Sequence, residues 1–291
     1  MKGIPTVSSS NSDRVYRLGG RIGKGTRGTV YLATSDNENY AIKFIKKKHG
    51  KRTLSLIEKE VLPRCSKCNS VMKLLDVVKL SGRLGLVYEY MDGDLYKLRE
   101  EIAKPLYDQP ELILAIIYSI SRALDVLHSN GKYPVCHGDV KLENILYRKT
   151  NDRYEFKLCD FDLLNGNEEG MGELQGTIAF FCPQYIFRSK YNDDTSVPIK
   201  ICKRNDWWAL GCAMYELYSS NDVFDEIYDK EKEVDVEKVV GLPYIIQSKL
   251  PFETPIQKFL ADCIYTLFEA KNLDLPCRIL ENYPEILHIL K

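Results

Sequence analysis

A set of polar residues in the middle of the chain has the types and spacing that phosphoryl transfer requires. Asp139, Lys141 and Asn144 lie close together in sequence, and Asp160 follows them. Phosphoryl transfer needs a carboxylate that orients the acceptor hydroxyl, a cation beside the moving phosphoryl group and oxygen ligands for magnesium. We therefore expect Asp139 to accept the hydroxyl proton, Lys141 to steady the phosphate, and Asn144 with Asp160 to bind the metal.

A glycine-rich segment could hold the phosphates of the nucleotide that such chemistry uses. Gly23, Gly25, Gly28 and Val30 form the pattern G-x-G-x-x-G-x-V. Glycines let a turn bring its backbone N–H groups against phosphate oxygens, where a Cβ would collide. Both flanks are strand-like, so the segment fits a hairpin over a nucleotide better than the strand-to-helix turn of a dinucleotide-binding fold. By itself, the pattern also fits an ordinary glycine-rich hairpin tip.

Lys43 lies in an apolar strand after this segment and needs an anionic partner to offset its desolvation. The helix predicted over residues 53–65 offers Glu58 and Glu60. At about 100° per residue, Glu58 falls on the apolar face of that helix and Glu60 on the opposite side. We therefore expect Glu58 to hold Lys43 toward the nucleotide.

The elements that must position these residues fall into two blocks. Over residues 14–90 the sequence alternates and is rich in β-branched and aromatic residues, which predicts a mostly antiparallel sheet with one helix. From residue 111 onward apolar residues recur three and four positions apart, which predicts helices. We expect a two-lobed α+β fold, with an N-lobe over about 14–90, a C-lobe over about 92–291 and a cleft between them. The polar residues 1–13 have the composition of a disordered tail.

The composition excludes several classes of protein. The 291 residues are 44% hydrophobic, with 41 basic and 41 acidic side chains. Apolar residues suffice for a packed core, and zero net charge argues against a basic footprint for nucleic acid or anionic membrane. We expect no membrane helix, because no apolar stretch approaches ~20 residues, and no signal peptide.

The nine cysteines fit buried thiols in a reducing compartment, and we expect an intracellular protein, cytoplasmic or nuclear. Cys65 and Cys68 are the only closely spaced pair. Without a second pair or a histidine at ligand spacing, buried thiols are favoured over structural zinc.

In their order along the chain, these motifs resemble the eukaryotic-type protein kinase family over about residues 14–290. Lys141, two residues after Asp139, is similar to the serine/threonine branch. The resemblance implies a two-lobed kinase fold that transfers phosphate from ATP to serine or threonine hydroxyls of a protein substrate. It implies Mg²⁺ as the metal, with Mn²⁺ as an alternative. We expect a monomer without nucleic-acid or membrane partners.

The resemblance also assigns roles to residues outside the central motif. Tyr88 occupies the gatekeeper position. Thr177 occupies the substrate-docking position, and Asp206 that of the aspartate that braces the catalytic loop. The positions that the resemblance assigns to ATP binding are Ile22, Gly23, Gly25, Gly28, Val30, Ala41, Lys43, Tyr88, Glu89, Met91 and Leu146.

Gly138 departs from the family pattern because it replaces the usual arginine before the catalytic aspartate. In the family that arginine commonly pairs with a phosphate on the activation segment. Between Asp162 and Cys182 the only hydroxyl side chain belongs to Thr177. We therefore expect activity not to depend on phosphorylation of this segment.

Two further departures concern single carboxylates. Asp162 replaces the final glycine of the Asp-Phe-Gly motif, which adds negative charge near the metal site. Gln184 replaces a glutamate that usually pairs with the residue at Arg278, so we expect a neutral hydrogen bond there, weaker than an ion pair. On this basis Gln184→Glu is expected to raise thermal stability.

Two other functions remain open from the sequence. A small-molecule kinase of the aminoglycoside or choline type has a similar His-Gly-Asp, Asn and Asp-Phe-Asp pattern, but Lys141 and the segments around Thr177 and Asp206 resemble the protein-directed branch. A pseudokinase scaffold is suggested by the three departures. The retained lysine, aspartates and asparagine favour an enzyme.

Overall fold

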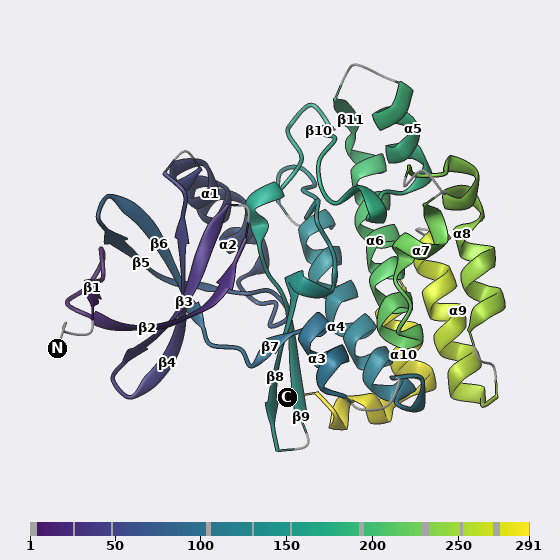
Figure 1. The fold of residues 1–291 in the computed structure, drawn as a ribbon, viewed down its shortest axis with the longest axis horizontal. Helices are drawn as coiled ribbons and strands as arrows, with labels where there is room; N and C mark the ends of the chain where they lie inside the picture. Colours follow the sequence, from purple (N-terminus) through teal and green to yellow (C-terminus); the bar gives the residue numbers. More distant parts are fainter. Residues whose placement is uncertain are drawn as a thin grey trace.

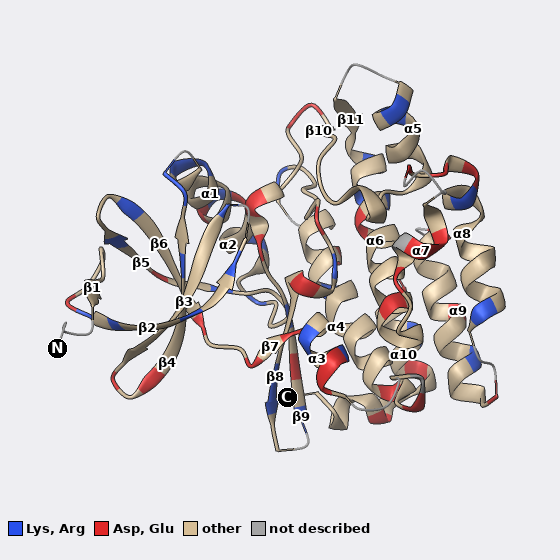
Figure 2. Ribbon diagram, viewed as in Figure 1, with Lys and Arg blue, Asp and Glu red and all other residues tan. Residues whose placement is uncertain are grey.

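The computed structural model describes residues 5–25, 27–47, 49–102, 106–129, 131–151, 153–191, 195–228, 233–250, 253–269 and 274–290. The chain forms a β-rich N-lobe and a larger helical C-lobe (Figure 1). This arrangement confirms the two-lobed α+β fold predicted from the sequence. Acidic and basic residues are interspersed over both lobes (Figure 2).

A six-stranded antiparallel sheet in the order β1-β2-β3-β4-β6-β5 builds the N-lobe. Alternating side chains from its strands, among them Tyr16, Ile42 and Val87, form one buried apolar cluster, since successive residues of a strand face opposite sides. The strands are β1 (Thr6–Ser8), β2 (Val15–Lys24), β3 (Gly28–Ser35), β4 (Glu38–Ile45), β5 (Leu74–Leu80) and β6 (Arg83–Glu89).

Strand β1 shows that the prediction of a disordered tail over residues 1–13 was wrong for Thr6–Ser8. This strand pairs with Val15–Arg17 of β2, and Val7 is buried. Ser9 Oγ donates a hydrogen bond to Asp76 Oδ1 at 2.9 Å. Pairing with the sheet edge and one buried apolar side chain offset the cost of ordering this polar segment.

The helical segment of the N-lobe is not a uniform α-helix. It consists of α1 (Gly50–Leu56), the π-helical turn η1 (Ile57–Val61) and α2 (Leu62–Cys65). A π-helical turn bonds residue i to residue i+5 and therefore has more residues per turn than an α-helix. Side chains after residue 56 consequently point in directions that differ from those of a regular helix.

The C-lobe contains a three-stranded sheet in the order β7-β8-β9, a two-stranded sheet of β10 and β11, and the remaining helices. Their bounds are β7 (Gly93–Asp94), α3 (Leu95–Glu101), η2 (Leu106–Asp108), α4 (Pro110–Ser129), η3 (Leu142–Asn144), β8 (Ile145–Thr150), β9 (Arg153–Leu158), η4 (Phe161–Leu163), β10 (Met171–Glu173), η5 (Ile178–Phe180), α5 (Pro183–Tyr191), β11 (Ser196–Pro198), α6 (Ile199–Ser219), α7 (Val223–Ile227), α8 (Val236–Lys249), α9 (Pro255–Glu269), α10 (Leu275–Asn282) and η6 (Pro284–His288).

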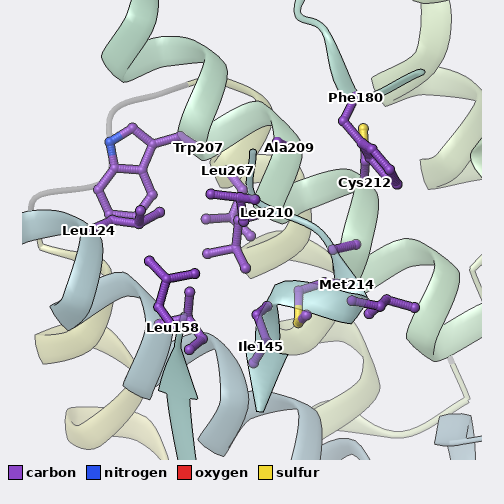
Figure 3. Packing of buried hydrophobic residues seen from close by; sticks show 14 of the residues in the cluster. Leu124, Ile145, Leu158, Phe180, Trp207, Ala209, Leu210, Cys212, Met214 and Leu267 are labelled. Atoms are coloured by element: carbon purple, nitrogen blue, oxygen red, sulfur yellow. The ribbon is translucent and has the colours of Figure 1, made fainter. Parts of the chain in front are cut away.

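Helices α4 and α6 form the centre of the C-lobe. Figure 3 shows Leu124 of α4, Leu158 of β9 and Leu210 of α6 directed into one apolar interior. Within the described ranges, α4 alone is long and apolar enough to cross a membrane, but 72% of its most apolar window is buried inside the protein. A core helix meets the same criteria, and the burial of α4 explains its composition. Asp206 of α6, which also binds His128 at the end of α4, accepts a hydrogen bond from the loop over residues 137–144, called the catalytic loop below.

Candidate active site

The catalytic loop brings the residues of the central motif into direct contact. The Asn144 side-chain Nδ2 donates hydrogen bonds to Asp139 O at 2.7 Å and to Asp139 Oδ2 at 3.1 Å. Lys141 Nζ lies 3.1 Å from Asp139 Oδ2. Thr177 Oγ1 donates to Asp139 Oδ1 at 2.7 Å and accepts from Lys141 Nζ at 3.2 Å. A carboxylate, a cation and an amide therefore meet at one place.

Asp206 of α6 holds this loop from below, as expected from the resemblance. Its Oδ2 accepts hydrogen bonds from His137 N at 2.7 Å and from His128 Nε2 at 2.8 Å, and its Oδ1 accepts from Gly138 N at 2.9 Å. The Asp206 side chain is 1% exposed. Three buried donors thus depend on one buried carboxylate, which fixes the backbone directly before Asp139.

Gly138 lets the activation segment lie directly on the catalytic loop. Its φ is +83°, and a Cβ there would come within 2.6 Å of Leu163 O. Gly176 has φ +124°, and a Cβ at this position would come within 2.3 Å of Gly138 O. Only glycine fits such close backbone approaches at positive φ without strain. An arginine at position 138 is therefore incompatible with this arrangement.

Lys43 of β4 lies between two carboxylates of the turn at residues 160–162. Its Nζ is 2.7 Å from Asp160 Oδ1 and 2.7 Å from Asp162 Oδ2. Burial lowers the pKa of Lys43, but the two carboxylates outweigh it and leave the pKa raised. Burial likewise acts to raise the pKa of Asp160, and the Lys43 charge reverses the shift, so that the Asp160 pKa is lowered.

Glu58 does not hold Lys43, so the predicted pairing with the helix was wrong. Glu58 is exposed. Glu60, the rejected alternative, is an ion-pair partner of Arg64 and accepts a hydrogen bond from Tyr133 Oη at 2.7 Å. The prediction assumed 100° per residue, whereas both glutamates lie in the π-helical turn η1, where that angle does not apply.

The residues assigned to ATP binding lie on neighbouring strands of the N-lobe and at its junction with the C-lobe. Gly25 N donates to Gly28 O at 2.9 Å and closes the tip of the β2–β3 hairpin. Val30 is the register partner of Lys43, and Ala41 that of Tyr88. The remaining members are Ile22 and Gly23 on β2, Glu89 at the end of β6, the buried Met91, and Leu146 on β8.

The two predicted metal ligands fit a magnesium ion. Cys159 N donates to Asn144 O at 2.9 Å, which brings the segment before Asp160 against the asparagine. Because the Asn144 side-chain nitrogen is turned toward Asp139, its Oδ1 is the ligand atom that it can offer. The Asp160 side chain is 39% exposed and adds a carboxylate. Carboxylate and amide oxygens with room for water are the ligands that Mg²⁺ prefers.

Arg278 does not contact Gln184, so the predicted pairing was wrong. Arg278 lies on α10 and forms an ion pair with Asp262 of α9. It also donates to Thr266 Oγ1 at 3.5 Å. Gln184, at the start of α5, is exposed. The resemblance assigned Arg278 by its late position in the chain, and that position gives no information about which helix packs against α10.

Besides the two carboxylate contacts of Lys43, further contacts of the site were not predicted. Arg27 Nη1 donates to Asp162 O at 2.7 Å, which links the glycine-rich hairpin to the turn at residues 160–162. Asn165 accepts from Glu173 N at 2.6 Å and donates to Glu173 O, so it holds the activation segment. Each of these contacts uses a backbone group that any residue type would supply, so no sequence signal could have found them.

Comparison with known proteins agrees with this geometry. A family model described as "Protein kinase domain" matches residues 16–276. The chain belongs to the protein kinase family. This kinase domain is 27% identical over 262 residues to "Cyclin-dependent kinase-like 5" of Mus musculus, which covers 87% of the chain and 26% of that protein.

Two further relatives belong to the same broad group. "Cyclin-dependent kinase 4 homolog" of Caenorhabditis elegans is 29% identical over 237 residues, 76% of the chain and 54% of that protein. Human "MAPK/MAK/MRK overlapping kinase" is 27% identical over 269 residues, 90% of the chain and 57% of that protein. The kinase domain therefore spans between about a quarter and somewhat over half of the length of these relatives.

Proposed function

We propose that this chain is an ATP-dependent serine/threonine protein kinase. The observation that carries the proposal is the convergence of Asp139, Lys141 and Asn144 with Thr177, close to the Lys43–Asp160 pair. The Asp139 carboxylate already accepts a hydrogen bond from the hydroxyl of Thr177. An acceptor serine or threonine would make the same kind of contact, with Asp139 as the proton acceptor.

The other residues complete the chemistry. Lys43 and Lys141 supply positive charge for the nucleotide phosphates and the transferring phosphoryl group. Asn144 and Asp160 would hold the Mg²⁺ ion, which neutralises phosphate charge when bound. The kinase family uses ATP with a divalent metal and acts on proteins. The position of Lys141 after Asp139, and relatives whose names include "serine/threonine-protein kinase", favour serine and threonine as acceptors.

We further propose that activity does not require phosphorylation of the activation segment. Asn165 bonds to both backbone groups of Glu173, and Gln175 Nε2 donates to Leu163 O at 3.0 Å. The segment also adds β10 to β11, and Glu168 pairs with Lys132 at 2.8 Å. These contacts supply the order that a phosphate bound to an arginine would otherwise supply.

The protein is also proposed to be a monomer in a reducing, intracellular compartment. All nine cysteines are free thiols. Burial raises the pKa of the Cys65 thiol to about 12, which makes it an inert core side chain.

Transfer of radiolabelled phosphate from ATP to a degenerate peptide library tests the proposal. We expect incorporation on serine or threonine, unchanged after phosphatase treatment of the protein, and a loss of about 100-fold or more in Asp139→Asn or Asp160→Asn. Nucleotide binding without transfer would identify a scaffold instead. Loss of activity on phosphatase treatment, with a phosphosite mapped to residues 162–182, would contradict the independence from phosphorylation.

A further inference from the structure

Asp162 makes the contact with Lys43 that the sequence led us to expect from a glutamate of the helical segment. Its Oδ2 is 2.7 Å from Lys43 Nζ, and its side chain is 5% exposed. Asp160 lies at the same distance, but its side chain is 39% exposed and it is the candidate metal ligand. When Asp160 is bound to a metal ion, Asp162 is the enclosed carboxylate that still faces the lysine. Enclosure strengthens such a charge-assisted hydrogen bond, because water screens it little.

Neither glutamate of the helical segment 50–65 binds Lys43. Glu58 is exposed. Glu60 binds Arg64 and Tyr133, and Arg64 Nη2 donates to Tyr133 O at 2.8 Å. Gly131 has φ +100°, and a Cβ there would come within 2.7 Å of Arg64 Cζ, so the loop after α4 is shaped around this arginine. Glu60 therefore ties the helix to the C-lobe and is not placed to hold Lys43.

The backbone of Asp162 is also fixed. Arg27 of the glycine-rich hairpin donates to Asp162 O at 2.7 Å. Asp160 has the left-handed φ of 65°, whereas Asp162 lies within the 3-10 turn η4 and is not among the positive-φ residues of the described chain. A Cβ at position 162 is therefore accommodated without backbone strain. One residue connects the hairpin, the lysine and the metal-binding turn.

We propose that Asp162 is the positioning residue for Lys43 and replaces a helix carboxylate in that task. The Asp162 carboxylate holds the lysine ammonium toward the nucleotide phosphates, and its carbonyl holds the glycine-rich hairpin through Arg27. The helical segment 50–65 then takes no direct part in orienting Lys43. This inference rests on the proposed function, because an oriented lysine affects rate only if the nucleotide reacts.

Steady-state kinetics of Asp162→Asn, with Glu58→Gln as the matched control, test the assignment. Asparagine keeps the shape and removes the charge that fixes the ammonium, so we expect kcat to fall about 10-fold or more. The KM for ATP should change less than about threefold, because the lysine is retained and can still bind phosphate. Calorimetry that shows ADP binding to Asp162→Asn with full stoichiometry would exclude unfolded protein as the cause of the lower kcat. Glu58→Gln should keep kcat within about twofold of wild type.

Chemical labelling tests the pairing without catalysis. The measured quantity is the rate at which acetic anhydride acetylates Lys43, followed by mass spectrometry and normalised to the exposed Lys97. In the wild-type protein two carboxylates bind the Lys43 ammonium and make it less available to the reagent. Asp162→Asn should therefore raise the acetylation rate of Lys43 severalfold, and Glu58→Gln should leave that rate unchanged. Asp162→Gly restores the family's usual residue and should behave like Asp162→Asn. It replaces Asp162→Asn in the experiment if that variant does not fold.

The outcomes separate this inference from the proposed function. An unchanged kcat in the Asp162 variants would overturn it, whatever the effect of Glu58→Gln or Glu60→Gln. So would unchanged labelling of Lys43. If the wild-type chain transfers no phosphate, the proposed function fails, and the labelling rates alone decide whether Asp162 holds Lys43.

Discussion

The lower and upper halves of the candidate site are held by different kinds of contact. In the lower half, the backbone before Asp139 is bonded to Asp206, whose side chain is 1% exposed. In the upper half, Lys43 lies between Asp160 and Asp162, and Asp160 is partly open to solvent. Buried hydrogen bonds to a charged group cost most when one partner is removed, whereas partly exposed ion pairs rearrange more cheaply.

The comparison indicates a division of labour. The lower half is part of the folded core, so its residues should affect stability and activity together. The upper half is the part that must exchange partners when a nucleotide binds, so its residues should affect catalysis more than folding.

The largest expected effect is at Asp206. Asp206→Ala leaves three buried donors without their acceptor, and we expect a loss of about 3 kcal/mol or more in the free energy of unfolding. Chemical denaturation measures it. Asp262→Ala is the control, because it removes an exposed carboxylate that is also ion-paired and should cost less than about 1 kcal/mol. Similar losses for the two variants would mean that burial of Asp206 adds no cost, which would contradict this account of the lower half.

Gly138→Arg restores the family's usual residue and should nevertheless be harmful. The φ of +83° and the 2.6 Å approach to Leu163 O oppose any Cβ, so we expect a loss of about 2–3 kcal/mol in the free energy of unfolding. Gly138→Ala should lose a similar amount, because the collision is at the Cβ.

Gly170→Ala provides the matched control for position 138. Gly170 has φ +72°, but the nearest atom to a Cβ there is 4.0 Å away. For Gly170→Ala we therefore expect a loss of only about 1 kcal/mol in the free energy of unfolding, which comes from backbone strain. A gain in stability or activity for Gly138→Arg would show that the loop rearranges to accept an arginine.

Glu216, on the same helix as Asp206, gives a pH-dependent test of the lower half. Burial raises its pKa from 4.5 to about 7, and it accepts a hydrogen bond from Val223 N at 3.0 Å. Below pH 4.5 the carboxyl is protonated in both the folded and the unfolded chain. Between pH 4.5 and 7 only the unfolded chain releases its proton, so stability should fall across this window by about 3 kcal/mol and then level off.

Glu216→Gln should remove that fall, because an amide does not titrate and its oxygen can still accept from Val223. Thermal or chemical denaturation of both proteins at pH 5 and pH 8 gives the comparison. Equal pH dependence in wild type and variant would assign the effect to other groups.

The lower half was also the part that could be predicted from the sequence. Asp139, Lys141 and Asn144 lie within one short loop, so a few backbone angles determine how their side chains meet. The role of Asp206 in holding the catalytic loop was inferred from the family resemblance. The two lobes were inferred from the strand-like alternation and the helical periodicity of the sequence. Each of these inferences depends on local geometry or on a pattern that extends over a whole element.

The predictions that failed concern contacts between separate elements. The choice of Glu58 depended on a constant angle per residue, and the π-helical turn η1 changes that angle. The pairing of Arg278 depended on which helix packs against α10, and spacing carries no such information. Strand β1 was missed because a short edge strand with one buried residue has the composition of a tail. The carboxylates of Lys43 lie more than a hundred positions away in sequence.

Glu60→Gln and Glu58→Gln sharpen the contrast between tethering and catalysis in the helical segment. Glu60 pairs with Arg64, whose side chain is 5% exposed, so loss of the charge should lower the free energy of unfolding by about 1–2 kcal/mol. Glu58→Gln changes the same group at an exposed position two residues away and should stay within about 0.5 kcal/mol. Equal effects on unfolding would mean that Glu60 is not a tether.

Gln184→Glu should have the smallest effect, in contrast to the gain expected from the sequence alone. Gln184 is exposed and Arg278 is already paired with Asp262, so a new carboxylate finds no waiting cation. We expect the free energy of unfolding to change by less than about 0.5 kcal/mol. The double variant Gln184→Glu with Asp262→Ala is the sharper test. If Arg278 could reach position 184, freeing it from Asp262 would let the new glutamate restore stability; in this geometry the two changes should simply add.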